Sequence, residues 1–470
     1  MTSSDSPTPG RGPGLRWRNR DHTRGNLIVS LLVLALPSLA TSLSSVVFQL
    51  TDLTFISRLG EAPMAAVVIV NQSLRQTFFL VLMGGSLGTQ ALIARAIGAG
   101  DVEGAEHVAG QAIALGAGIS LALMAIGGAF PEFLFSLPGP NASFYEHGVP
   151  YVRLVFLLNF GLVGSLFFNS ILSGAGDTMT PLFVMLIQTA VAICAEWVLI
   201  FGNLGLPAFG VKGVALGVAT GQITAMLVGI GVLFSGRARV HLRRRHLWPD
   251  VVVLKQLLKL SVPPALQMAG GVVTTFAFLR LAGGFGESVQ AAYAIGLRLG
   301  MLGPIICFPL ASACATIVGQ SLGARNVPRA WRTVRVGLVV HGTVMLSLAT
   351  FLFFFRFEIL ETFSKDPDVI QAGGVYLRFL AITFVLWAFY FPTLRSLQGA
   401  GDFLAPMGIS LGSTFFVAIP LAWALSQHSG LGATGIWTAQ VAAGLLMTTG
   451  TVLWLATGRW TRRAAQSRPE

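Results

Sequence analysis

The chain has 470 residues, of which 54% are hydrophobic and only 11% are charged. A soluble globular domain has about 25% charged residues, so this composition excludes soluble enzymes and predicts an all-α protein that crosses a membrane many times. The net charge of +12 does not indicate nucleic-acid binding, because Lys and Arg mark the cytoplasmic loops of membrane proteins.

The pattern of apolar residues predicts twelve spanning helices. Residues 1–26 are rich in Pro, Gly, Ser and Arg, which is typical of a disordered tail. Each segment that follows has close to the ~20 residues that a spanning helix needs, or more. The predicted segments are 27–57, 63–93, 107–130, 150–173, 180–202, 210–235, 252–282, 288–320, 331–355, 374–398, 404–427 and 430–457.

The basic residues predict the orientation. They gather in the N-terminal tail, in the stretch 236–251, in the loop after the eighth segment and in the tail 458–470. The opposite-side loops at 131–149 and 203–209 contain no Lys or Arg. The positive-inside rule then places both termini in the cytoplasm, and we expect a multi-pass protein of the plasma (inner) membrane.

An internal repeat divides the chain into two halves. The sequence LALP at 34–37 recurs as LSVP at 260–263, and SGAGD at 173–177 recurs as QGAGD at 398–402. The numbers of equivalent positions differ by 225 or 226 along the whole repeat. This indicates a duplicated unit of six helices, and because six is even, both copies face the same way in the membrane.

The duplication predicts two six-helix bundles at 27–235 and 252–457, joined by a basic cytoplasmic linker at 236–251. Their pseudo-two-fold axis runs along the membrane normal. Parallel repeats of this kind are typical of transporters, which place the substrate path at the interface between the repeats.

Two acids lie well inside the apolar segments, Asp52 in the first and Glu196 in the fifth. The repeat pairs Asp52 with Phe278 (278 − 52 = 226) and Glu196 with Ala422 (422 − 196 = 226), so the second half carries neither acid. An acid at the centre of a spanning helix costs about 2.5–3.5 kcal/mol on insertion scales and usually marks a functional site. Hydrogen bonding of a buried polar group, or contact with the outer surface, is the alternative interpretation.

The depth of the two acids favours a shared site. Asp52 lies ~37 Å of helix from Leu27, and Glu196 lies ~24 Å from Thr180, so both fall in the outer half of the first bundle. Two carboxylates in one dry site cannot both be ionised cheaply. We therefore expect the pair to hold a proton near neutral pH, as a proton carrier would.

Other polar residues at membrane depth are candidates for a substrate cavity, with hydrogen bonding between helices as the alternative. Pro37 is either a tolerated kink or a hinge. No catalytic constellation or metal-ligand spacing is present, and we expect no cofactor. The cavity candidates are Asn71, Gln72, Arg75, Asn169, Gln188, Gln267 and Arg298.

Several short motifs occur in order along the chain: LTDLTFISRLG at 50–60, ARAIGAGD at 94–101, SGAGDTMTP at 173–181, EWVLIFG at 196–202, FGVKGVALGVATGQ at 209–222 and IVGQSLGA at 317–324. With Pro37, they resemble the multidrug and toxic compound extrusion (MATE) family across almost the whole chain between the tails. The DinF-like branch is the most similar, and the resemblance implies a cation site at Asp52 and Glu196 and a first helix that bends at Pro37 on protonation. The sequence departs from that branch in having Glu196 where Asp is usual and Ala192 where Asn is frequent.

The leading hypothesis is a secondary active exporter, not an enzyme. It would couple inward movement of H⁺ or Na⁺ to efflux of small amphiphilic, cationic compounds by alternating access. We expect a monomer whose partners are small-molecule substrates and membrane lipids, and not nucleic acid. A flippase for a lipid-linked precursor, another membrane carrier, and a membrane-embedded enzyme are the alternatives.

Overall fold

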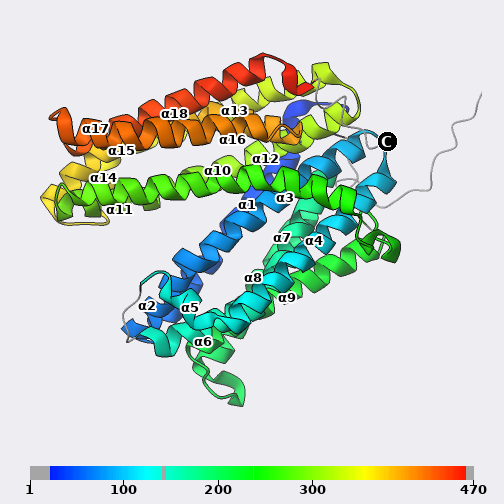
Figure 1. Cartoon of the computed structure of the whole chain (residues 1–470), viewed down its shortest axis with the longest axis horizontal. Coiled ribbons are helices and arrows are strands. Elements are labelled where there is room, and N and C mark those ends of the chain that lie inside the picture. Colours follow the sequence, from blue (N-terminus) through cyan, green and yellow to red (C-terminus); the bar gives the residue numbers. More distant parts are fainter. Residues whose placement is uncertain (1–21, 140–143, 237, 462–470) are drawn as a thin grey trace, which may run out of the picture.

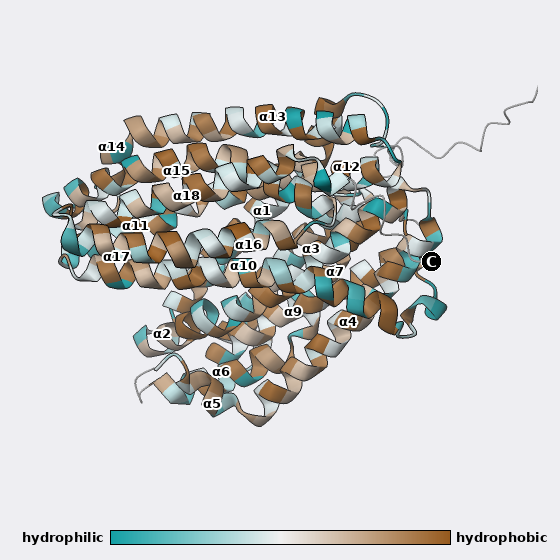
Figure 2. Ribbon diagram, turned by 45° about the horizontal axis from the view of Figure 1, so that its top comes forward, coloured by the Kyte–Doolittle hydropathy of each residue, from teal (hydrophilic) through white to brown (hydrophobic). Residues whose placement is uncertain are grey.

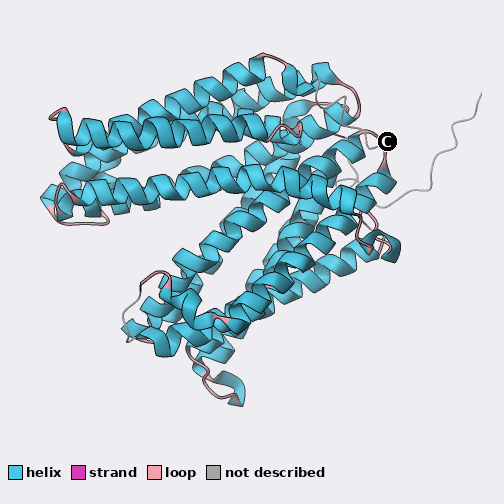
Figure 3. Cartoon of the chain, viewed as in Figure 1, coloured by secondary structure: helices cyan, strands magenta, loops and turns pink. Residues whose placement is uncertain are grey.

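The computed structural model describes residues 22–139, 144–236 and 238–461. These residues form helices joined by short loops and contain no strand (Figure 3). Within them, eleven helices are long and apolar enough to cross a membrane, or twelve if one bent pair counts as a single span. The predicted all-α membrane fold is therefore confirmed. The predicted tails fall outside the described residues up to residue 21 and from residue 462.

The first half of the chain forms the N-terminal bundle, α1 to α9 (Figure 1). Its helices are α1 (Leu27–Ser57), α2 (Glu61–Val70), the π turn η2 (Asn71–Arg75), α3 (Gln76–Gly98), α4 (Val102–Ala129), α5 (Pro131–Ser136), α6 (Tyr145–Leu157), α7 (Phe160–Ala175), α8 (Met179–Phe201) and α9 (Val211–Phe234).

The second half forms the C-terminal bundle, α10 to α18. Its helices are α10 (Val251–Gly283), α11 (Glu287–Gly300), α12 (Leu302–Gly323), α13 (Val327–Phe354), α14 (Arg356–Glu361), α15 (Pro367–Gly399), α16 (Leu404–Gly412), the π turn η6 (Ser413–Ala418), α17 (Ile419–His428) and α18 (Ala433–Ala456).

Several spans that the sequence predicts as single helices are interrupted. The second span is α2, η2 and α3 in succession, and its π turn holds three of the predicted polar candidates. The fourth span bends by 45° between α6 and α7. Residues within a π turn leave the regular helical register, and such turns are frequent at functional sites.

The two bundles pack against each other at one end and diverge toward the other (Figure 1). At the packed end, which we call the closed end, Leu31 and Leu34 of α1 share a hydrophobic cluster with Cys314 and Ile317 of α12. Toward the other end, the clusters around Tyr151 and around Tyr376 each contain residues of one bundle alone. Many large hydrophobic side chains are exposed on the long helices, and Figure 2 shows hydrophobic residues (brown) along their length.

A reciprocal contact at the closed end reflects the internal repeat. A Cβ on Gly98 would overlap the backbone of Gln320, and a Cβ on Gly323 would overlap the backbone of Arg95. Both residue pairs are related by 225 (323 − 98 and 320 − 95), so the two contacts exchange under the repeat, as in a two-fold interface. Small residues here let the bundles approach closely.

The linker between the bundles is docked on α4 of the N-terminal bundle. Gln111 Nε2 donates to the carbonyls of His246 and Trp248 at 3.0 and 2.7 Å, and Gln111 Oε1 accepts from the backbone N–H of Asp250 at 2.8 Å. Gly110 leaves room for the chain at His246. The buried Gln111 amide thus binds the linker at three points, and Glu103, Glu106 and His107 of α4 add further contacts to it.

Candidate functional site

The structure brings Asp52 of α1 and Glu196 of α8 together in the N-terminal bundle; we call them the acid pair. Their carboxyl groups are close enough to interact electrostatically. Glu196 is fully buried, and Asp52 is partly buried. Among the described residues, no group donates a hydrogen bond to either Glu196 oxygen or to Asp52 Oδ1. Buried acceptors without a donor are costly, so this pair is not explained by structural hydrogen bonding.

Glycines of α9 allow Glu196 to lie deep in the bundle. The glycines at 213, 217 and 221 recur at every fourth position and therefore line one face of α9, which packs on α8. A Cβ on Gly217 would lie 2.5 Å from Glu196 Cγ and 2.8 Å from its Cα. Small residues at this spacing are a common way for membrane helices to approach closely.

Side-chain bonds connect α1 and α8 below the acid pair. Pro37 has no N–H and leaves the carbonyl of Val33 without its helical donor. The hydroxyl of Thr178, the residue before α8, donates to that carbonyl at 3.3 Å. Farther along, the hydroxyls of Ser44 and Thr189 are 3.1 Å apart. Pro37 and the acid pair are therefore parts of one helix–helix contact.

The π turn η2 ends in a positively charged side chain that lies near the acid pair. Arg75 ends this turn, and its charge acts on both Asp52 and Glu196. Asn71, at the start of the turn, accepts a hydrogen bond from the Tyr151 hydroxyl at 3.1 Å. Tyr151 is buried close to both acids. The sequence prediction missed Tyr151; a hydroxyl-bearing aromatic residue at the start of an apolar segment was the available signal.

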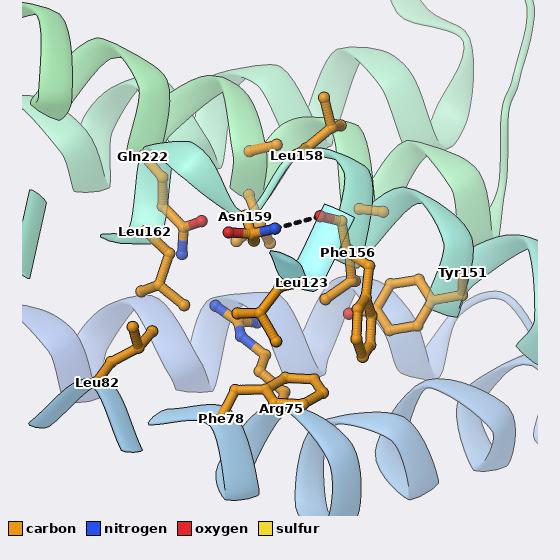
Figure 4. A pocket seen from close by; sticks show the side chains of 14 residues that line it. Arg75, Phe78, Leu82, Leu123, Tyr151, Phe156, Leu158, Asn159, Leu162 and Gln222 are labelled. Carbon is orange, nitrogen blue, oxygen red and sulfur yellow. Dashed lines mark hydrogen bonds between the residues drawn. The ribbon is translucent and has the colours of Figure 1, made fainter. Parts of the chain in front are cut away.

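A small cavity begins beside Arg75 (Figure 4). Its volume is about 30 Å³, which suits one or two water molecules. Asn159, between α6 and α7, also faces it and donates to the carbonyl of Phe156. Gln222 of α9 faces it from another side. The cavity thus extends from Arg75 into the interior of the N-terminal bundle, and neither acid lines it.

The remaining candidates are not gathered at this site. Gln72 is exposed, and Asn169 and Gln188 are partly buried. Gln267 belongs to the C-terminal bundle, where its amide donates to the Tyr390 hydroxyl at 2.8 Å, and Arg298 is exposed on α11. Their roles in a substrate cavity stay predictions.

A second polar group at membrane depth, which the sequence prediction did not single out, joins the bundles at the closed end. Arg395 of α15 is buried and donates to Gln90 Oε1 of α3 at 2.8 Å and to Gln398 Oε1 at 2.8 Å. Gln90 Nε2 in turn donates to the hydroxyls of Ser312 and Thr316 of α12 at 2.9 and 3.0 Å. We call these five residues the interbundle network.

The repeat shows that this charge belongs to the second half alone. The position equivalent to Arg395 in the first half is Ser170 (395 − 170 = 225), whose hydroxyl bonds Ser86 within the N-terminal bundle. In the sequence, Arg395 could have been recognised as functionally important because it lies deep in an apolar segment. Nothing in the sequence pairs Arg395 with Gln90, because the two residues come from different halves of the chain.

Comparisons with known proteins agree on the family. The MatE family model matches residues 37–198 and 263–424, and the starts of the two matches differ by the same offset as the internal repeat. "Probable multidrug resistance protein NorM" of Thermotoga maritima is 26% identical over 93% of this chain and 94% of its own. "Probable multidrug resistance protein YoeA" of Bacillus subtilis is 25% identical over 88% of this chain and 90% of its own.

Solved structures show the same fold. "Crystal structure of MATE in the bent conformation" has a TM-score of 0.87 at 23% identity and covers 97% of this chain and 100% of that one. An outward-facing multidrug resistance MATE family transporter has a TM-score of 0.84 at 23% identity, with 98% and 100% covered. Because the family model matches more than half of the sequence in two copies, the chain belongs to the MatE family of multidrug efflux transporters.

Proposed function

We propose that the chain is a secondary active exporter that couples inward proton movement to efflux of small amphiphilic cations. The observation that carries this proposal is the acid pair. Neither Glu196 oxygen nor Asp52 Oδ1 accepts a hydrogen bond among the described residues, and the second repeat has Phe278 and Ala422 instead of the two acids. The relatives named as probable multidrug resistance proteins support efflux of drug-like small molecules.

The surroundings of the acid pair favour H⁺ over Na⁺ as the coupling ion. Two adjacent carboxylates in a dry site are stabilised when they share a proton, and a proton requires only one carboxyl oxygen. A sodium ion would require several oxygen ligands beside the positive charge of Arg75.

Protonation would act on the contact between α1 and α8. Adding a proton to the acid pair removes the repulsion between Asp52 and Glu196, so the preferred separation of the two helices changes. Pro37 removes one backbone hydrogen bond from α1, and the hydroxyl of Thr178 donates to the Val33 carbonyl that this leaves free. The proton would thus bias a two-state element, which is the general way a local charge change moves a helix.

Alternating access further requires the closed end to separate. The interbundle network and the glycine contacts at Gly98 and Gly323 hold it together, while the opposite end lacks a shared hydrophobic cluster among the described residues. This arrangement supports an outward-facing state. Export follows if proton and substrate bind the two states with different affinity, because linkage then couples them.

The placement of the acids in the first and fifth spans supports the DinF-like branch. Ala192, where an asparagine is frequent in that branch, contacts Gly221 of α9, so close packing replaces a polar group one turn from Glu196. The basic residues at the closed end support cytoplasmic termini in a plasma (inner) membrane. We propose that a monomer carries out the cycle.

Export of a fluorescent cationic dye from cells tests the proposal. Asp52→Asn should abolish export while insertion and yield stay normal, because the variant cannot hold and release a proton. Glu132→Gln is the matched control. It removes an exposed acid of α5, at the end where the two bundles diverge (Figure 1), and should export like the wild type. Full export by Asp52→Asn would overturn the proposal.

A further inference from the structure

The first turns of α13 form a charged hollow on the outside of the C-terminal bundle. The hollow has a volume of about 440 Å³ and is lined by Pro328, Trp331, Arg332 and Arg335. It is remote from the acid pair and from the substrate path between the bundles. Neither the transport proposal nor the family assignment gives it a role.

The charge in this hollow is uncompensated. Arg332 and Arg335 are exposed and stand three positions apart, so their guanidinium groups are neighbours on one helix face. Among the described residues, neither has an acidic partner. The guanidinium of Arg329, by contrast, already forms hydrogen bonds within the protein. It donates to the carbonyls of His22, Arg24 and Gly25, which precede α1.

The length of α13 places the two arginines at the membrane boundary. The stretch Val336–Phe354 contains no Asp, Glu, Lys or Arg and spans ~27 Å at 1.5 Å per residue. This matches the ~30 Å hydrocarbon core of a bilayer. Arg332 and Arg335 therefore lie at the level of the lipid headgroups. Trp331, a residue type enriched at that level, is fixed against Trp460 with ring centroids 5.1 Å apart.

An apolar stripe continues from the arginines into the membrane. Val339, Leu346 and Phe353 follow Arg335 at helical spacing on the same face of α13. Their side chains are exposed, by 69% for Val339 and 55% for Leu346. A molecule with an anionic head and an apolar tail would match both parts of this surface at once.

We propose that this face of α13 is a binding site for an anionic phospholipid. The headgroup phosphate lies between Arg332 and Arg335, whose planar guanidinium groups match phosphate oxygens in pairs, and an acyl chain lies along Val339 and Leu346. Basic pockets at this membrane level are known to hold anionic headgroups. The site depends only on membrane insertion and not on the coupling mechanism.

Native mass spectrometry of the full chain tests the site. Protein in detergent is mixed with dioleoylphosphatidylglycerol or dioleoylphosphatidylcholine, and retained lipid is counted. The wild type should retain the anionic lipid over the neutral one by roughly tenfold, given the attraction of each basic residue. Arg332→Gln/Arg335→Gln should remove this preference, and Arg332→Lys/Arg335→Lys should restore part of it, because the charge returns without the planar fork.

Arg356→Gln is the matched control. Arg356 begins α14, just beyond the far end of α13, and its guanidinium covers the rings of Phe353 and Phe357. Its loss should leave the lipid preference intact, because it lies far from the headgroup position at Arg332 and Arg335. Equal retention of both lipids by the wild type, or an unchanged preference in the double glutamine variant, would overturn the proposal. Displacement of the lipid by excess inorganic phosphate would also overturn it, since that result indicates a site for soluble anions.

Discussion

Arg395 Nη2 lies 2.8 Å from Gln90 Oε1, and this hydrogen bond joins the two bundles at the closed end. The guanidinium is buried, and its bonded partners are neutral side chains. A buried charged donor that loses its acceptor is destabilised by about 1–3 kcal/mol or more. The closed end is therefore held by a bond that strongly favours the packed arrangement and that must break when the bundles separate there.

Gln90→Leu should consequently increase opening of the closed end. Cys314, which is buried in the cluster shared by the bundles, is a native probe for this motion in a Cys194→Ala/Cys307→Ala background. Its labelling by a maleimide should accelerate about tenfold, as a loss of about 1.4 kcal/mol implies. Gln398→Leu removes an acceptor of the same arginine within one bundle and should change the labelling rate much less. Equal rates in the two variants would contradict this role of Gln90.

Pro37 and Thr178 should be energetically coupled. Thr178→Val leaves the Val33 carbonyl without a donor and should cost about 1 kcal/mol. In a Pro37→Ala background the new N–H of residue 37 bonds that carbonyl, so the same change should cost little. Thermal unfolding of the wild type, the two single variants and the double variant gives the coupling free energy between the two positions. Additive effects would show that the hydroxyl does not compensate for the proline. Pro37→Ala should also slow turnover more than it weakens substrate binding.

Gly217→Ala should disturb the acid pair. The added methyl would overlap Glu196 and its backbone, and overpacking of this kind costs about 1–3 kcal/mol. Lower melting temperature and loss of coupled export are both expected. Gly231, on the same helix, has no atom within 4 Å of an added Cβ, so Gly231→Ala should be neutral or stabilising by up to about 1 kcal/mol. Similar losses in both variants would contradict the packing role of Gly217.

The linker should weaken its contact with α4 in acid. Burial lowers the pKa of His246 below its ordinary value, although the nearby carboxylate of Glu106 opposes the shift. The folded pKa is then below the unfolded value of about 6.5, so the stability that His246 contributes is full above that pH and is lost as the pH falls toward the folded pKa. His107, Arg243 and Arg245 face the ring as well and also disfavour its charged form.

Melting temperatures of the wild type and His246→Gln measure this effect. The advantage of the wild type at about pH 7.5 should shrink at about pH 5.5, because protonation of the buried ring is unfavourable. A difference that is the same at both pH values would show that His246 does not titrate in this range.

The sequence predicts the parts of the fold that depend on local pattern. Hydrophobic runs and the internal repeat give the spans and the two bundles, and the same repeat isolates Asp52 and Glu196 as acids without counterparts. Breaks within spans, such as the π turn that ends at Arg75, depend on packing between helices and leave little periodic signal. The contact between Gln90 and Arg395 could not be predicted, because its two residues are 305 positions apart and come from different bundles.

The central claim is that Asp52 and Glu196 carry the coupling proton. Export of a cationic dye from proteoliposomes under an imposed pH gradient, compared with an imposed Na⁺ gradient, tests it most directly. The account predicts that the pH gradient alone drives export by the wild type, and that Asp52→Asn and Glu196→Gln each abolish this export. Export driven by Na⁺ alone would contradict the choice of ion, and gradient-driven export that persists in both variants would contradict the site.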